Sequence, residues 1–253
     1  MTIQTKERLH LLDALRGFLM LNMIAYHGMW DLVYLFGVKA GWYSGTPKYL
    51  WQQFICWSFI LLSGFCWSFS RNHLRRGLMV FGGGAVISLV TNLLMPENRI
   101  LFGVLTCIGS CMLLLIPLEK HLRKIPAIAG IPVSFGLFFL LRNCHKGSLG
   151  FESLVLAPLP GWLYRNNVTA FLGFPQPGFF STDYFPLIPW IFLFLTGFYL
   201  RILLDRYDLP RRLFSRGRVP LLNQVGRWSL QVYMVHQPVL YGLGMLWYHL
   251  IKT

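Results

Sequence analysis

Residues 11–31 read LLDALRGFLMLNMIAYHGMWD, an apolar run that is long enough to cross a bilayer yet carries three ionisable side chains. At about 100° per residue, Asp13, Arg16 and His27 fall on one stripe of a helix. Arg16 and His27 are then separated along the axis by roughly 16 Å, about half the hydrocarbon thickness. Because an ionisable residue inside a span is costly, the stripe favours a functional site. The alternative is an interfacial Asp13–Arg16 pair, with His27 at the opposite headgroup zone.

The composition is that of an integral membrane protein. Hydrophobic residues make up 55% of the 253 residues and charged residues only 13%, and the apolar residues come in long blocks. No linker-like stretch or internal repeat divides the chain, so we expect one domain over 1–253. The five cysteines lie in or beside apolar segments, which indicates neither a disulfide framework nor a metal site.

Seven apolar segments predict an all-α, polytopic membrane helix bundle. They cover residues 11–30, 49–70, 77–95, 100–118, 125–142, 184–204 and 228–250. The connection 143–182 holds a further apolar piece, 154–164, but Pro158 and Pro160 make it too short and broken for a span. We expect this piece to form a re-entrant or interfacial segment, or an ordinary loop on the headgroups.

Lysine and arginine are distributed unequally between the two sides of this topology. Of the 23 cations, fourteen lie in the N-terminal tail and the second, fourth and sixth connections, and seven lie on the opposite side. Arg16 and Arg227, at the starts of spans, also fall on the first side. The positive-inside rule therefore places the N-terminus in the cytoplasm and the C-terminus outside. Topology explains most of the net charge of +14, so nucleic acid is not an expected partner.

Further ionisable side chains accompany the last two segments. Asp183 precedes the sixth segment, at the same outer end as His27. In the seventh segment Ser229, Tyr233 and His236 share a helix face, and His236 lies well inside the predicted bilayer. On its own, His236 is also explained as a buried histidine that is bonded to a neighbouring span.

Four stretches carry a resemblance to a known family. They are residues 12–17 (LDALRG) followed by His27, 59–64 (FILLSG), 183–190 (DYFPLIPW) and 226–238 (GRWSLQVYMVHQP). Together they resemble the transmembrane acyltransferases, which include the acyltransferase-three O-acetyltransferases, and among these the bacterial relatives of heparan-α-glucosaminide N-acetyltransferase. The lysosomal enzyme has its active histidine in the loop after the first helix, where this chain has none. His27 fits the bacterial acyltransferase pattern instead, so the acceptor does not carry over.

The resemblance implies transfer of an acyl group, acetyl above all, from cytoplasmic acyl-coenzyme A to a hydroxyl or amine of a sugar or lipid-linked glycan on the extracytoplasmic side of the membrane, which in a bacterium is the plasma (inner) membrane. It implies His27 as the catalytic base, with Asp31 or Asp183 to orient it, and no metal. The residues that it implies for binding acetyl-coenzyme A are Arg16, Asp13, Arg75, Arg76, Arg227, Ser229, Tyr233 and His236. The positive-inside rule is by itself enough to explain the positions of most of these arginines. The implied partners are the lipid bilayer, the coenzyme, a glycan or amino-sugar acceptor and, in a homo-oligomer, further copies of the chain.

A transporter or flippase for small molecules or lipid-linked sugars would also place polar residues in the middle of a bundle. Such folds favour inverted repeats and broken helices in corresponding halves, and the sequence shows no repeat. Labelled acetyl-coenzyme A separates the two hypotheses, because an enzyme transfers or hydrolyses it whereas a transporter takes it up without turnover.

The unequal charge distribution predicts the outcome of a reporter fusion. A reporter fused after Thr253 should be active outside the membrane and silent in the cytoplasm, because seven crossings put the two termini on opposite sides. Activity on the cytoplasmic side would require an eighth crossing, for which 143–182 is the first candidate.

Overall fold

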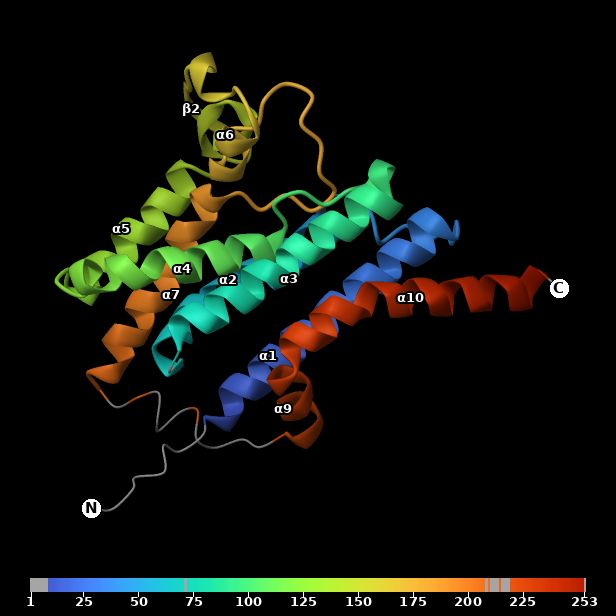
Figure 1. The fold of residues 1–253 in the computed structure, drawn as a ribbon, viewed down its shortest axis with the longest axis horizontal. Coiled ribbons are helices and arrows are strands. Elements are labelled where there is room, and N and C mark those ends of the chain that lie inside the picture. The colour runs from blue at the N-terminus through green and yellow to red at the C-terminus, as the bar shows by residue number, and fades with distance from the viewer. Residues whose placement is uncertain (1–8, 71, 208, 210–213, 215–218, 253) are drawn as a thin grey trace. The chain divides into compact units, whose positions relative to one another are not determined.

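The computed structural model describes residues 9–70, 72–207, 209, 214 and 219–252, which are mostly helical (Figure 1). The chain divides into two compact units, Met1–Phe59 with Tyr207–Thr253 and, between them, Ile60–Arg206. Composition predicts a single domain over 1–253, and the division falls inside a helix, so no linker marks it. The cations that lie outside the described residues are Lys6, Arg8, Arg71, Arg211, Arg212, Arg216 and Arg218.

Helices occupy all seven predicted segments. They are α1 (His10–Trp30), α2 (Gly45–Phe65), α3 (His73–Leu94), α4 (Val104–Leu122), α5 (Ala127–Leu140), α7 (Leu187–Asp205) and α10 (Ser229–Lys252). Among the described residues, four stretches are long and apolar enough to cross a membrane, namely α3, α4, Ala127–Lys146 and α7. Helices α1, α2 and α10 have 21, 21 and 24 residues, but polar side chains interrupt their apolar runs. Seven crossings and a cytoplasmic N-terminus therefore stay predictions.

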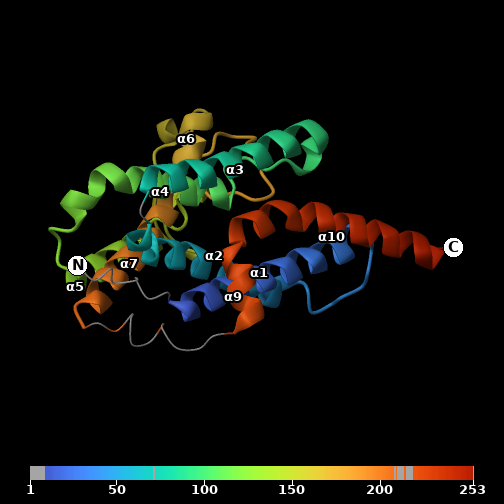
Figure 2. The ribbon, with the colours of Figure 1, turned by 60° about the horizontal axis from the view of Figure 1, so that its bottom comes forward.

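In the first unit, the short helix α9 (Pro220–Arg227) packs against α1 with the two backbones in contact (Figures 1 and 2). A Cβ atom on Gly17 would collide with the carbonyl oxygen of Leu222, and one on Gly226 would collide with that of Asp13. The Asn223 side chain donates a hydrogen bond to the carbonyl of His10 at the start of α1. Helix α10 begins at Ser229, two residues after Arg227. The contacts of α9 with α1 therefore fix the position along α1 at which α10 starts.

The core of the first unit forms around the apolar face of α1. Met20, Met23 and Tyr26 pack with Tyr43 and Ile55 as one buried cluster. Tyr43 is fully buried, and its hydroxyl donates a hydrogen bond to the Tyr26 carbonyl at 2.8 Å. Helix α10 lies alongside α1, contains Pro238 and changes direction partway along its length (Figure 1).

In the second unit, small residues let the helices approach one another closely. Gly84 of α3 faces Thr106 of α4, and Gly197 of α7 faces the Leu61 backbone. The hydroxyls of Ser134 in α5 and Thr196 in α7 lie 2.9 Å apart. Gly77 and Gly84 of α3 and Gly109 of α4 thus have a packing role, which is common for small residues between membrane helices.

The connection between α5 and α7 departs from the all-α prediction. It contains β1 (Ser148–Phe151) and β2 (Leu154–Pro158), which pair antiparallel, and the short helix α6 (Asn167–Leu172). The turn leaves only Glu152 and Ser153 unpaired, and Glu152 has a φ of 51°, which matches two-residue hairpin turns. At the β-bulge beside Leu149, Gly150 has a φ of 133° and leaves no room for a Cβ atom.

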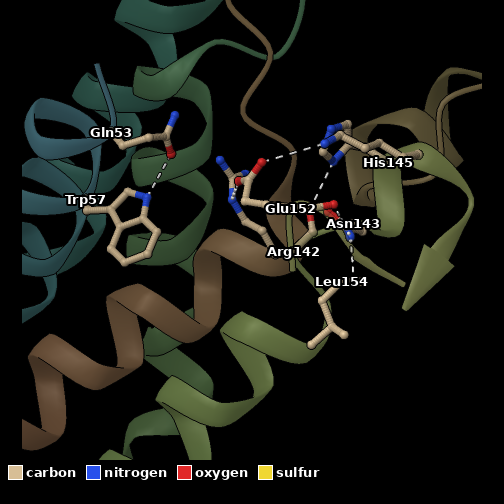
Figure 3. Close-up of polar contacts among 8 residues, drawn as sticks. Gln53, Trp57, Arg142, Asn143, His145, Glu152 and Leu154 are labelled. Atoms are coloured by element: carbon tan, nitrogen blue, oxygen red, sulfur yellow. Dashed lines mark hydrogen bonds and ion pairs between the residues drawn. The ribbon is translucent and has the colours of Figure 1, made fainter. Parts of the chain in front are cut away.

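The turn of this hairpin is held by polar groups that follow α5. The Asn143 side-chain amide donates to the carbonyls of Glu152 and Leu154 at 3.1 and 3.2 Å (Figure 3). Arg142 pairs with Glu152 at 3.5 Å and lies over the Trp190 ring. The apolar piece 154–164 is therefore a strand followed by a 3₁₀ turn, Gly161–Leu163, rather than a helix that re-enters the bilayer. Its place at the membrane surface stays a prediction.

The contact between α9 and α1 predicts the effect of adding one methyl group. Gly226→Ala should destabilise the folded protein by about 1–3 kcal/mol, because its Cβ atom meets the Asp13 backbone rather than a flexible side chain. Gly242→Ala, in α10 of the same unit, is the matched control, since nothing lies within 4 Å of its Cβ position. Thermal unfolding in detergent measures both. Equal stability of the two variants would contradict the backbone contact.

Candidate active site

The Asp13–Arg16 end of the α1 stripe forms an ion pair. The Arg16 guanidinium lies 3.3 Å from the Asp13 carboxylate, and Asp13 is 7% exposed. The acid lies in the first turn of α1, where the helix dipole stabilises negative charge. The structure thus contains the Asp13–Arg16 pair of the alternative interpretation. This pair lies about 16 Å along the helix from His27.

At the other end of the stripe, His27 lies against His236 of α10. Their ring centroids are 5.0 Å apart, with the planes inclined by 57°. His236 is 8% exposed, whereas His27 is half-buried. Tyr26 packs edge-on against His27, and Tyr233 packs against His236 at 5.3 Å. The packing of α9 on α1 therefore brings two histidines together that are more than 200 residues apart in sequence.

The hydrogen bond at Nδ1 of His236 indicates which of its ring nitrogens carries the proton. Its Nδ1 lies 2.6 Å from the Tyr233 carbonyl oxygen, which can only accept, so Nδ1 carries the proton. In the neutral ring Nε2 is then an acceptor. This Nε2 atom is buried and has no hydrogen-bond partner among the described residues.

Asp31 and Gln237 form a second polar pair beside the histidines. The Gln237 side-chain amide donates to the Asp31 carboxylate at 2.8 Å, and Asp31 is only 2% exposed. Asp31 begins a π-helical turn, Asp31–Leu35, and such turns are frequent at functional sites. The second carboxylate oxygen of Asp31 and the amide oxygen of Gln237 lack partners within the described part of the chain.

Together these groups present acceptors without matching donors. On Asp31, Gln237 and His236, the atoms without a hydrogen-bond partner among the described residues are a carboxylate oxygen, an amide oxygen and an imidazole nitrogen. Buried acceptors of this kind are costly unless a donor reaches them. The arrangement therefore suits a ligand that carries N–H or O–H groups, next to an imidazole pair that can accept a proton.

The remaining predicted residues lie elsewhere. In the first unit Arg227 is exposed at the end of α9, and Ser229 begins α10. Arg75, Arg76 and Asp183 belong to the second unit. The backbone N–H of Arg75 donates to the Asn72 side chain, which caps α3. Of the predicted set, the structure thus brings His27, His236, Tyr233 and Asp31 to one end of α1, and Asp13 and Arg16 pair at the other.

Asp183 has a well-defined structural environment in the second unit. Its carboxylate accepts a hydrogen bond at 3.4 Å from the N–H of Val104, the first residue of α4. Next to it, the Ser181 hydroxyl accepts from the Leu101 N–H and donates to the Leu101 carbonyl. The Phe185 N–H bonds to the Phe102 carbonyl. Residues 181–185 therefore hold the connection between α3 and α4 in place.

Two side chains of the site are absent from the sequence-based prediction. Gln237 belongs to the quoted His236-Gln237-Pro238 stretch, and its position beside a buried histidine is the signal that could have indicated it. Tyr43, which bonds to the residue before His27, has no such signal, because it lies in the loop after α1.

No metal cluster is found at this site: among the described residues, no group of three or more His, Cys, Asp or Glu side chains could hold a metal ion. The apolar helices are those of an integral membrane protein, and the imidazoles of His27 and His236 are groups that can transfer a proton. The family described as heparan-alpha-glucosaminide N-acetyltransferase, catalytic, matches residues 8–238, and the chain belongs to this family of membrane acetyltransferases. The resemblance noted in the sequence is thereby confirmed. No curated protein and no solved structure matches the chain.

Burial of Asp183 predicts a pH-dependent stability. Burial raises the pKa of the Asp183 carboxyl to about 6, and the hydrogen bond from Val104 opposes this shift. Because the pKa is higher in the folded than in the unfolded state, the contribution of this group to stability falls as the pH rises from about 4 through 6. Asp183→Asn keeps an acceptor for Val104 but carries no charge. Its melting temperature relative to wild type should therefore rise across this window and level off above it.

Thermal unfolding in detergent between pH 4 and pH 8 measures this difference. Glu97→Gln, which removes an exposed carboxylate from the connection between α3 and α4, is the control. A difference between Asp183→Asn and wild type that is constant with pH would show that Asp183 is not the group responsible.

Proposed function

We propose that this membrane acetyltransferase moves an acetyl group from cytoplasmic acetyl-coenzyme A to the amine or hydroxyl group of a sugar outside the plasma (inner) membrane of a bacterium. The family supports acetyl transfer, and the charge distribution of the loops supports the sidedness. The observation that carries the proposal is the contact of half-buried His27 in α1 with buried His236 in α10.

His27 is the proposed general base. Among the described residues of the first unit, no hydrogen bond to a ring nitrogen of His27 is found, and the ring is half-buried, so an acceptor can reach it. Histidine changes protonation near neutral pH, which suits it to take a proton from an attacking amine or hydroxyl. The neighbouring unpartnered acceptors on Asp31 and Gln237 suit the other donors of a sugar.

In the proposed reaction the acceptor nitrogen or oxygen attacks the thioester carbonyl. A C–N or C–O bond forms, the C–S bond breaks, and His27 takes the proton of the attacking group. The proton then passes to the sulfur of the leaving coenzyme. Because the thioester is already activated, deprotonation and positioning of the acceptor are the tasks that the protein must perform.

The coenzyme phosphates require cations. Arg16, Arg75, Arg76 and Arg227 are the proposed contacts, since guanidinium groups bind phosphate bidentately. Arg75 and Arg227 are exposed, whereas Arg16 would exchange its Asp13 partner for phosphate. Ser229 and Tyr233 on α10 are proposed to line the path of the pantetheine arm. Orientation of His27 by Asp31 or Asp183 also remains a proposal.

Loss of His27 is the test of the reaction. His27→Ala should lower kcat about 10²–10⁴-fold, the usual range for a lost acid–base group, while folding and coenzyme binding are retained. The measurement is transfer of labelled acetyl from acetyl-coenzyme A to a panel of amino sugars and neutral sugars, with mass spectrometry of the products. Wild-type protein in liposomes is measured alongside the variant. The thermal stability of both proteins is the control for folding.

Two results would contradict the proposal. Near-wild-type turnover by His27→Ala would place the base elsewhere. Uptake of a substrate by wild-type protein without any acetyl transfer or hydrolysis would favour a transporter.

A further inference from the structure

We propose that His236 is a positioning residue for His27: its Nε2 accepts a hydrogen bond from one ring N–H of His27 and so directs the other ring nitrogen at the acceptor substrate. The inference rests on the proposed function, because it assigns a partner to the proposed base. It differs from the sequence-based expectation, in which His236 binds the coenzyme.

The tautomer of His236 is the first support. The bond from Nδ1 to the Tyr233 carbonyl leaves Nε2 as the acceptor, and this atom is buried without a partner among the described residues. A buried acceptor without a donor is unfavourable, so a donor nearby is expected to bond to it. A side chain that can supply this donor is the imidazole of His27, whose ring centre is 5.0 Å from that of His236.

The surroundings of the pair are the second support. The polar groups that face it from the packed elements are Tyr26 of α1, Asp31 at the end of α1, and Tyr233 and Gln237 of α10. Asp31 is bonded to Gln237, and no carboxylate of the first unit's described residues bonds to either imidazole. Within this unit, His236 is therefore the group in position to orient His27.

The proposed bond requires the His27 ring to rotate. The two rings are in contact without an N–H···N bond, and the χ2 torsion of histidine is broad, so His27 can turn at little cost. Catalytic hydrogen bonds are often incomplete before the substrate binds. When His27 takes the proton of the acceptor, both of its nitrogens carry protons, and the one that faces His236 keeps its bond.

The experiment compares two substitutions that keep different atoms of His236. His236→Asn keeps an amide donor near Nδ1 for the Tyr233 carbonyl but has nothing at Nε2. His236→Gln can place its amide oxygen near Nε2. We expect His236→Asn to lower kcat about 10–100-fold with little change in KM, the size of effect seen when a catalytic group is misplaced. His236→Gln should recover most of this loss.

The control is His249→Asn, the same substitution at an exposed histidine of the same helix, which should leave kcat unchanged. The double variant His27→Ala/His236→Asn should be no slower than His27→Ala, because His236 acts through His27. Wild-type kcat in folded His236→Asn, or additive losses in the double variant, would overturn the proposal.

A readout without turnover separates this inference from the proposed function. In protein labelled with ¹⁵N-histidine, His236→Asn should shift the ring-nitrogen signals of His27, whereas His249→Asn should not. If these signals shift but no sugar is acetylated, the pair exists and the proposed reaction is wrong. If acetyl transfer depends on His27 but the ring-nitrogen signals of His27 do not shift in His236→Asn, the positioning role is wrong and the proposed reaction is retained.

Discussion

The contact between the backbones of α1 and α9 is the constraint on which the first unit depends. Gly17 and Gly226 each face a carbonyl of the opposite helix, and Asn223 bonds to the carbonyl of His10. Because α10 begins directly after α9, this contact determines how far along α1 each residue of α10 lies. His236 therefore comes to rest against His27, and Gln237 against Asp31.

Much of this fold follows from the sequence alone, since long apolar runs leave few alternatives to helices. The ionisable stripe of α1 is equally readable from the spacing of Asp13, Arg16 and His27. The His27–His236 contact is not, because helix periodicity says which residues share a face but not which helix that face meets. The Asp31–Gln237 bond joins residues 206 positions apart, and it depends on the crossing of α1 and α10 rather than on either helix.

The hairpin illustrates a different limit. The run Leu154-Val155-Leu156 is short and apolar, and such a run is compatible with a buried helix segment, a strand or a membrane-surface piece. What selects the strand is Asn143, whose side-chain amide bonds to two carbonyls of the hairpin, together with the space that Gly150 leaves for the opposite strand. Neither cause is visible in the hydrophobic pattern of residues 154–164.

The division of the chain into units has a consequence for biogenesis. The first unit is completed only when α9 and α10 have been made, about 190 residues after α1. At about 5–20 residues per second, the ribosome needs on the order of 10–40 s for that interval. During this time the Asp31 carboxylate has no Gln237, and the carbonyl of His10 has no Asn223. The nascent α1 is thus a helix of marginal hydrophobicity with unsatisfied polar groups, which the membrane-insertion machinery must retain until the last tenth of the protein emerges.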